Sequence, residues 1–297
     1  MLFPFFGGKT RVAALVWEHL GNPELYVEPF AGSLAVLLAR PDEPRTEIVC
    51  DLDGYIANFW RAIQNQWPEM QAHLTGLVSE IDLRAQHNHL LASREGLNEK
   101  LAADYTWCDA RLAALWWMGI SSYLGSGFGH RAARQRPHID RSLKGAWATG
   151  MTDEKVEKVM RRIGHVIVLA GDWQDAWRRS ATKAIINRFD RGVGVFLDPP
   201  YSGGKRATGL YAEDQHLNKD VTEWALDQPH HVRIVIAGYA DEYPDLAAAG
   251  WDRIYWKAPN GYAQKDNSRR KAEVLYVRVP PFRRRRVTRA NPAPVPG

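Results

Sequence analysis

The sequence predicts an α/β protein of the Rossmann-like kind, with one mostly parallel sheet covered by helices on both faces. Three observations predict it. Short runs rich in β-branched and aromatic residues recur along the chain, several of them are almost continuously apolar, and the segments between them have lengths that suit crossover helices. A chain of 297 residues, 45% of them hydrophobic, can bury one sizeable core and still carry an additional lobe.

The predicted strands share this apolar, β-rich character. In chain order they cover residues 25–30, 47–52, 165–173, 192–201, 232–239, 251–256 and 272–279. Pro280 and Pro281 then end the regular structure, because proline cannot donate to a sheet. Helix-like segments are expected at residues 10–20, before the first strand, and at residues 34–40, after it.

The strand pattern stops between residues 53 and 164, where helix-like segments such as 56–67 and 109–124 take over. We therefore expect an inserted, mostly helical lobe over residues 56–159, and a sandwich core formed by residues 1–55 and 160–280. Residues 281–297 are expected to form a basic, disordered tail.

Charge and cysteine content exclude several classes of protein. The net charge of +5 matches the five arginines of the tail, so the rest of the chain is close to neutral. Such a tail either binds phosphates or is merely solubilising. Cys50 and Cys108 lack metal-ligand spacing, which argues against disulfides and metal sites. Without a long apolar run or a signal peptide, the expected location is the cytoplasm, and the expected partners include no membrane. We expect the protein to be a monomer.

The strongest motif is Asp198-Pro199-Pro200-Tyr201, at the end of a predicted strand. Ligands of open α/β sheets bind at the carboxyl ends of the strands. An exocyclic amino group of a base is a poor nucleophile, because its lone pair is delocalised into the ring. The Asp198 carboxylate and the Pro199 carbonyl can accept both amino N–H bonds and free that lone pair. Tyr201 offers a face on which a base outside the duplex can stack. The alternative is a proline-rich strand exit.

Two further motifs lie near the N-terminus. The glycines at positions 7 and 8 permit close approach to a ligand, and Lys9 can neutralise a ligand carboxylate, although a plain turn before a helix explains them equally well. Residues 27–33 read Val-Glu-Pro-Phe-Ala-Gly-Ser and form a small-residue turn after the first strand, where nucleotide-like cofactors commonly sit. Asp51 ends the next strand and can accept hydrogen bonds from ribose hydroxyls, or it can cap a helix.

Basic residues gather in two segments without strand character. In the first, Arg131, Arg134, Arg136, Arg141 and Lys144 stand against one acid, Asp140. It can follow a phosphate backbone, or it is a solvated surface loop. In the second, Lys205 and Arg206 lie in a glycine-rich loop that can close on a substrate or can be plain surface.

In this order the motifs resemble the D12 class of adenine-N6 DNA methyltransferases, the Dam-like family, from Phe3 to about Val279. The resemblance implies an S-adenosylmethionine-dependent methyltransferase fold in which residues 56–159 are the target-recognition lobe. It implies methyl transfer to adenine N6 of double-stranded DNA in a bacterial or phage-infected cell, with or without a companion restriction enzyme. By resemblance, the cofactor contacts are Phe5, Gly8, Lys9, Asp51 and Asp198, Glu28 and Gly32 line the same pocket, and Asp172 and Trp173 border the cofactor's adenine.

Two departures and several alternatives accompany the resemblance. Pro4, Phe5 and Phe6 stand where the family often has Lys-Trp-Ala, and Leu34 stands where a glycine is commoner. The pocket chemistry also suits adenine in RNA, cytosine N4 in DNA and protein glutamine amides. Transfer to cytosine C5 is disfavoured because no Pro-Cys dipeptide is present to supply a nucleophile. A degenerate DNA-binding module is disfavoured because Lys9, Asp51 and Asp198 are intact.

Overall fold

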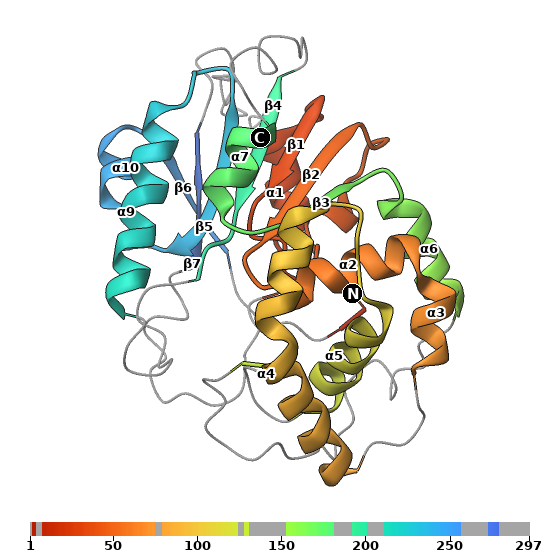
Figure 1. The fold of residues 1–297 in the computed structure, drawn as a ribbon. Coiled ribbons are helices and arrows are strands. Elements are labelled where there is room, and N and C mark those ends of the chain that lie inside the picture. The colour runs from red at the N-terminus through yellow and green to blue at the C-terminus, as the bar shows by residue number, and fades with distance from the viewer. Residues whose placement is uncertain are drawn as a thin grey trace, which may run out of the picture.

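The computed structural model describes residues 2–3, 8–74, 79–123, 128–130, 153–180, 192–200, 211–256 and 273–278. Its centre is a seven-stranded sheet with the order β3-β2-β1-β4-β5-β7-β6 (Figure 1). The strands are β1 (Leu25–Glu28), β2 (Thr46–Asp51), β3 (Ile167–Ala170), β4 (Val193–Leu197), β5 (Arg233–Tyr239), β6 (Asp252–Tyr255) and β7 (Glu273–Val277).

Strands β1 to β5 pair in parallel, and β7 runs antiparallel to both of its neighbours, β5 and β6. Each of the seven predicted strands is confirmed; β2 has its predicted length but begins one residue earlier, and the other six are shorter than their predicted ranges. The sheet and its helices are consistent with the methyltransferase fold that the resemblance implies. The chain runs outward from β1 through β2 to β3 and then returns to place β4 on the other side of β1. The strand order therefore reverses between β1 and β4.

Helices cover both faces of the sheet. The bounds are α1 (Ala13–Leu20), α2 (Gly54–Asn65), α3 (Trp67–Ala72), α4 (Glu80–Ala103), α5 (Ala110–Ser122), α6 (Asp153–Ile163), α7 (Trp173–Ser180), α9 (Tyr211–Asp227) and α10 (Pro244–Ala248). One core packs the sheet against α1, α2, α4 and α5, and the other packs it against α7, α9 and α10. Figure 1 shows α2 to α6 on the side of β3, and α9 and α10 on the opposite side.

Alternation along the strands produces these two cores. In β1, Tyr26 packs into the first core, whereas Leu25 and Val27 pack into the second. Successive side chains of a strand point to opposite faces, so a strand buried on both faces is mostly apolar. That is why these strands could be recognised in the sequence.

The described residues between β2 and β3 are mainly helical. Helix α2 packs against β2 and β3, and α3, α4 and α5 pack against α2. Their core is aromatic: the ring centroids of Phe59 lie 4.9 Å from Trp60 and 5.5 Å from Trp116. No described helix is long and apolar enough to cross a membrane. Cys50 and Cys108 are both buried.

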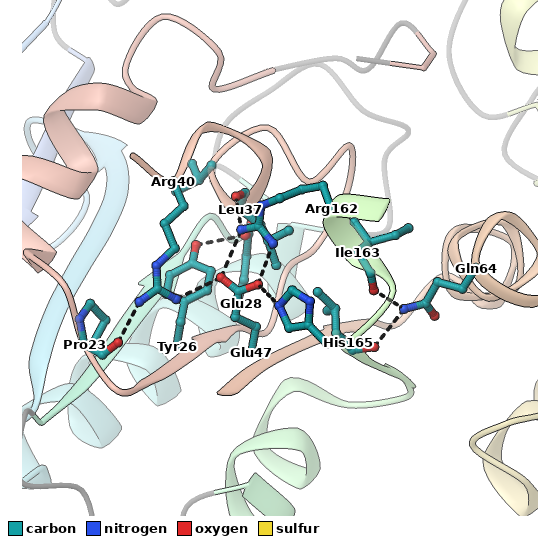
Figure 2. A network of polar contacts seen from close by, with 12 residues as sticks. Pro23, Tyr26, Glu28, Leu37, Arg40, Glu47, Gln64, Arg162, Ile163 and His165 are labelled. Carbon is teal, nitrogen blue, oxygen red and sulfur yellow. Dashed lines mark hydrogen bonds and ion pairs between the residues drawn. The ribbon is translucent and has the colours of Figure 1, made fainter. Parts of the chain in front are cut away.

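A buried ionic network ties β2 to α6 and to the segment after β1 (Figure 2). Glu47, on β2, has a fully buried side chain that accepts hydrogen bonds from Arg40 at 2.9 Å and from Arg162 at 2.7 Å. His165 lies 3.0 Å from the same carboxylate. Burial raises the pKa of Glu47, but the two arginines outweigh burial and leave the pKa below its usual value.

The helix predicted at residues 34–40 is wrong in type. The structure has a short 3₁₀ helix, η1 (Leu37–Ala39), preceded by turns. Leu34 has a φ of 54°, which an α-helix does not allow. Arg40 is extended, with a ψ of 123°, because it precedes Pro41. The apolar run is therefore interrupted at both ends.

Candidate active site

The candidate site lies where the strand order reverses. β1 ends at Glu28, β4 ends at Leu197, and Asp198 follows β4 directly. In open α/β sheets this crevice, outside the carboxyl ends of the strands, is the place where ligands bind. Five parallel strands deliver their carboxyl ends to one edge, so side chains distant in the sequence can meet there.

Lys9 and Asp198 meet at this edge. Lys9 Nζ lies 2.8 Å from Asp198 Oδ1, and the Lys9 side chain is buried to the same degree as core residues, whereas that of Asp198 is 21% exposed. The backbone carbonyl of Lys9 also accepts the N–H of Val12 at 3.0 Å, which joins the residue to the start of α1. The ion pair thus links the predicted glycine-lysine motif, through Lys9, to the predicted Asp-Pro-Pro-Tyr motif, through Asp198. Pro199 is buried and Pro200 is exposed.

Glu28, the last residue of β1, is almost fully buried. Tyr26 Oη donates a hydrogen bond of 2.8 Å to Glu28 Oε2, as Figure 2 shows. Burial raises the pKa of Glu28 to about 8; the hydrogen bond from Tyr26 opposes the rise and the charge of Asp198 adds to it. Glu28 is therefore a buried group at the end of β1 that interacts electrostatically with Asp198 and is mostly protonated at neutral pH.

Glu273, at the start of β7, is a neighbour that the sequence did not indicate. Burial raises its pKa, the charge of Lys9 lowers it, and the charge of Asp198 raises it, so the three groups interact electrostatically. Its position follows from the antiparallel pairing of β7 with β5, in which Glu273 faces Tyr239. No motif marks this residue, and only its place as the first residue of an apolar strand could have drawn notice.

The turn after β1 is held by the carboxylate of Asp51. The backbone N–H of Gly32 donates to Asp51 Oδ2 at 2.8 Å, and the Gly32 carbonyl accepts the indole N–H of Trp60 at 2.9 Å. Gly32 has a φ of 46°, a conformation that favours glycine. The two residues predicted as cofactor contacts, Gly32 and Asp51, are therefore brought together at the ends of neighbouring strands.

Asp51 is not a helix cap. The cap of α2 is Asp53, whose carboxylate accepts the N–H of Tyr55 at 3.1 Å. Asp51 Oδ1 instead accepts the N–H of Asp53 at 2.9 Å. Burial, followed by the charge of Asp53, raises the pKa of Asp51 to about 7, although the Gly32 and Asp53 N–H groups favour its ionised form. Asp53, which the motif analysis did not select, lies directly beside the predicted ribose contact.

Asp172 and Trp173 follow β3 and lie beside the end of β2, because the N–H of Gly171 donates to the Asp51 carbonyl at 3.0 Å. Trp173 is buried and stacks on Phe30 with ring centroids 6.1 Å apart. Asp172 is exposed, and its carboxylate accepts the N–H of Gln174 at 2.8 Å. The pair thus borders the turn that contains Phe30.

Gly8, another predicted cofactor contact, is among the residues that the structure describes and immediately precedes Lys9. The other predicted site residues lie outside the described part of the chain: Phe5, Tyr201, Arg131, Arg134, Arg136, Arg141, Lys144, Lys205 and Arg206. The basic tail, residues 281–297, lies outside it as well. Within the described residues, no group of His, Cys, Asp and Glu side chains is arranged to hold a metal ion.

Comparison with known proteins gives a family match for the N-terminal part of the chain. Residues 5–118 match the family model described as D12 class N6 adenine-specific DNA methyltransferase, which confirms the resemblance over that stretch. The matched stretch contains Lys9, Glu28, Gly32 and Asp51, and it ends before Asp198. No curated protein matches the chain significantly. At the family level the match supports an adenine-specific DNA methyltransferase, and the family implies S-adenosylmethionine as methyl donor.

Proposed function

We propose, starting from the match of residues 5–118 to the D12 class, that this chain methylates the N6 amino group of adenine in double-stranded DNA. The methyl donor is S-adenosylmethionine, and the acceptor is a base turned out of the duplex. The observation that carries the proposal is the 2.8 Å ion pair between Lys9 and Asp198. It joins the matched N-terminal stretch to the tetrapeptide that the match does not reach.

The donor set of this edge fits such a cofactor. Asp51 offers a carboxylate suited to ribose hydroxyls, and it is already held by two backbone N–H groups, those of Gly32 and Asp53. Lys9 offers a cation suited to a carboxylate, and Trp173 offers an aromatic wall beside the end of β3. We assign Phe5, Gly8 and Glu28 to the same pocket on the strength of the resemblance.

When bound, S-adenosylmethionine supplies a methyl group on a positively charged sulfur. The residues of the chain act on the other reactant, the amino group. The Asp198 carboxylate and the Pro199 carbonyl accept its two N–H bonds, so that the nitrogen lone pair is no longer shared with the ring. Lys9 orients the carboxylate through Oδ1. The buried Pro199 and its fixed φ hold the carbonyl in place.

DNA binding is assigned to the basic segments. Arg131, Arg134, Arg136, Arg141 and Lys144 are proposed to contact the duplex, Lys205 and Arg206 to approach the site, and Tyr201 to stack on the extruded base. The proposed division of the chain keeps residues 1–55 and 160–280 as the catalytic core, with residues 56–159 as the target-recognition lobe.

The direct test is methyl transfer from labelled S-adenosylmethionine to unmethylated duplex DNA, with RNA as a parallel substrate, followed by nucleoside analysis. We expect N6-methyladenine in DNA. N4-methylcytosine would change the assigned base, methylated RNA would change the assigned polymer, and no labelled nucleoside in either polymer would refute the proposed activity.

The role of Asp198 is tested by Asp198→Ala. We expect turnover to fall at least ~100-fold, the range seen when one preorganised group of an active site is removed. Asp241→Ala is the matched control because Asp241 is exposed on the loop after β5. Circular dichroism and thermal unfolding should show both variants folded. Wild-type turnover in folded Asp198→Ala would mean that this carboxylate does not activate the amine.

A further inference from the structure

Residues 128–130 are fixed against α4 by polar contacts and by packing. The N–H of Gly129 donates to His87 Nδ1 at 3.0 Å, and its carbonyl accepts from Arg94 Nη2 at 3.0 Å and from Arg94 Nε at 3.2 Å. Phe128 is buried against Gly119 of α5, where an added Cβ would lie 1.8 Å from the ring. Backbone and side chains therefore hold this segment in one position.

The next contact of the segment reaches the candidate site. His130 Nε2 lies 2.8 Å from Asp53 Oδ2, and Arg94 Nη1 lies 3.1 Å from Asp53 Oδ1. Arg94 also packs its guanidinium 4.9 Å from the ring centroid of Tyr55. Asp53 in turn donates its backbone N–H to Asp51 Oδ1 at 2.9 Å. One residue thus holds His130 through its side chain and Asp51 through its backbone.

The residues joined by these contacts also influence one another's pKa values. After burial, the charge of Asp53 is the main influence that raises the pKa of Asp51, and His130 lowers it. Although burial opposes them, His130 and Arg94 lower the pKa of Asp53. His87, which lies on α4 together with Arg94, also interacts with His130: the pKa of His87 is lowered by burial and by the charge of His130. Loss of either Arg94 or His130 would remove one of the two groups that counter the Asp53 charge beside Asp51.

We propose that Asp53, Arg94 and His130 are positioning residues for Asp51, and that cofactor affinity depends on residues 128–130 being seated against Asp53. The inference rests on the proposed function, in which Asp51 is a cofactor contact. His130 lies beyond the family match, which ends at residue 118, and Arg131, the first proposed DNA contact, is the next residue. On this proposal, the contact between His130 and Asp53 connects the proposed DNA-binding segment to the proposed cofactor contact Asp51.

The first test is calorimetric titration of the full-length protein with S-adenosylmethionine, without DNA, at pH 7.5. Arg94→Met should raise Kd about threefold or more, within the range seen for residues that act through a neighbour. Arg84→Met is the matched control, because Arg84 is exposed on the same helix. The control should bind within about twofold of wild type.

Conservative replacement separates positioning from simple loss of structure. His130→Ala should weaken binding, whereas His130→Gln, which keeps a nitrogen donor close to the place of Nε2, should restore most of it. The pH at which affinity is half-maximal gives a second signature. Arg94→Met should move it upward and Asp53→Asn downward, because the two substitutions change the charge beside Asp51 in opposite directions. The ligand's own amino group titrates nearby, but it affects every variant equally.

A third test unseats the segment from a distance. Gly119→Ala should displace Phe128 and thereby raise Kd, although Gly119 is on α5 and belongs to no ligand contact. Gly96→Ala on α4 is its control, because a Cβ there meets nothing within 4 Å. Thermal unfolding checks that both variants are folded.

The outcomes distinguish this inference from the proposed function. If the wild type binds S-adenosylmethionine, and Arg94→Met, His130→Ala and Gly119→Ala bind it as tightly as their controls, the positioning role is wrong while the activity can stand. If the wild type does not bind S-adenosylmethionine at all, both proposals fail together. Weaker binding in all three variants, with rescue by His130→Gln, supports the inference.

Discussion

Leu34 shows how one residue can carry both strain and packing. Its φ of 54° lies in the left-handed region, where a side chain costs roughly 1–2 kcal/mol, yet its side chain is fully buried. The N–H of Leu34 donates to the Ala31 carbonyl at 2.9 Å, which closes the turn that contains Gly32. A glycine at this position would avoid the strain, whereas this chain accepts the strain and gains a buried leucine.

Because of this strain, we predict that at position 34 the glycine variant is more stable than the alanine variant, the reverse of the usual order. Leu34→Ala should lose roughly 2–5 kcal/mol, because the packing is removed and the strain remains. Leu34→Gly should be more stable than Leu34→Ala by about 1 kcal/mol, because glycine tolerates this φ. Urea unfolding measures both. At Leu37, which is equally buried but not left-handed, the glycine variant should be the less stable of the two. The same order at both positions would contradict the strain.

At the scale of elements, Glu47 joins β2 to α6 and to the segment after η1. The carboxylate is shared by Arg40, Arg162 and His165, and the Arg40 side chain is as inaccessible as that of Glu47. A buried charge that loses its partner is strongly destabilising, whereas an exposed pair contributes little. The chain contains both kinds of pair, since α6 also carries the exposed pair of Glu157 and Arg161, 3.7 Å apart.

We therefore predict that Glu47→Gln lowers the free energy of unfolding by about 3–5 kcal/mol. Glu157→Gln should lower it by less than ~0.5 kcal/mol. Both values come from urea unfolding at neutral pH. Equal effects of the two substitutions would show that the buried network does not hold these elements together.

At the scale of the whole molecule, stability should depend on pH through carboxyl groups that the fold has buried. The pKa of Glu28 is raised to about 8 and that of Asp51 to about 7. A raised pKa means that the folded state holds its proton more tightly than the unfolded chain does. The stabilisation is therefore fully present below about pH 4, near the unfolded pKa values, and is lost as pH rises through the folded values.

Glu28→Gln isolates the larger of these two effects. Glutamine can still accept the Tyr26 hydrogen bond but does not titrate. The stability of the wild type relative to the variant should fall by about 3 kcal/mol between pH 5 and pH 8, as followed by urea unfolding across that range. A difference that is constant over this range would mean that Glu28 titrates normally.

The sequence by itself determined where the strands lie and was enough to show the family resemblance, and the chemistry proposed for each motif was inferred from it alone. A strand buried on both faces is mostly apolar, and the chemistry proposed for Asp198 and its prolines depends on groups that the sequence names directly. It did not determine the short 3₁₀ helix at 37–39, because a left-handed Leu34 leaves no periodic signal.

Only the tertiary structure decided which groups meet. It paired Lys9 with Asp198, placed Glu273 near both, and brought His130 to Asp53 across 77 positions of the chain. The physical reason is that periodicity reports the local burial of a residue and nothing about its distant partners. Those partners follow from the order of strands in the sheet and from the way in which α4 and residues 128–130 pack against the start of α2.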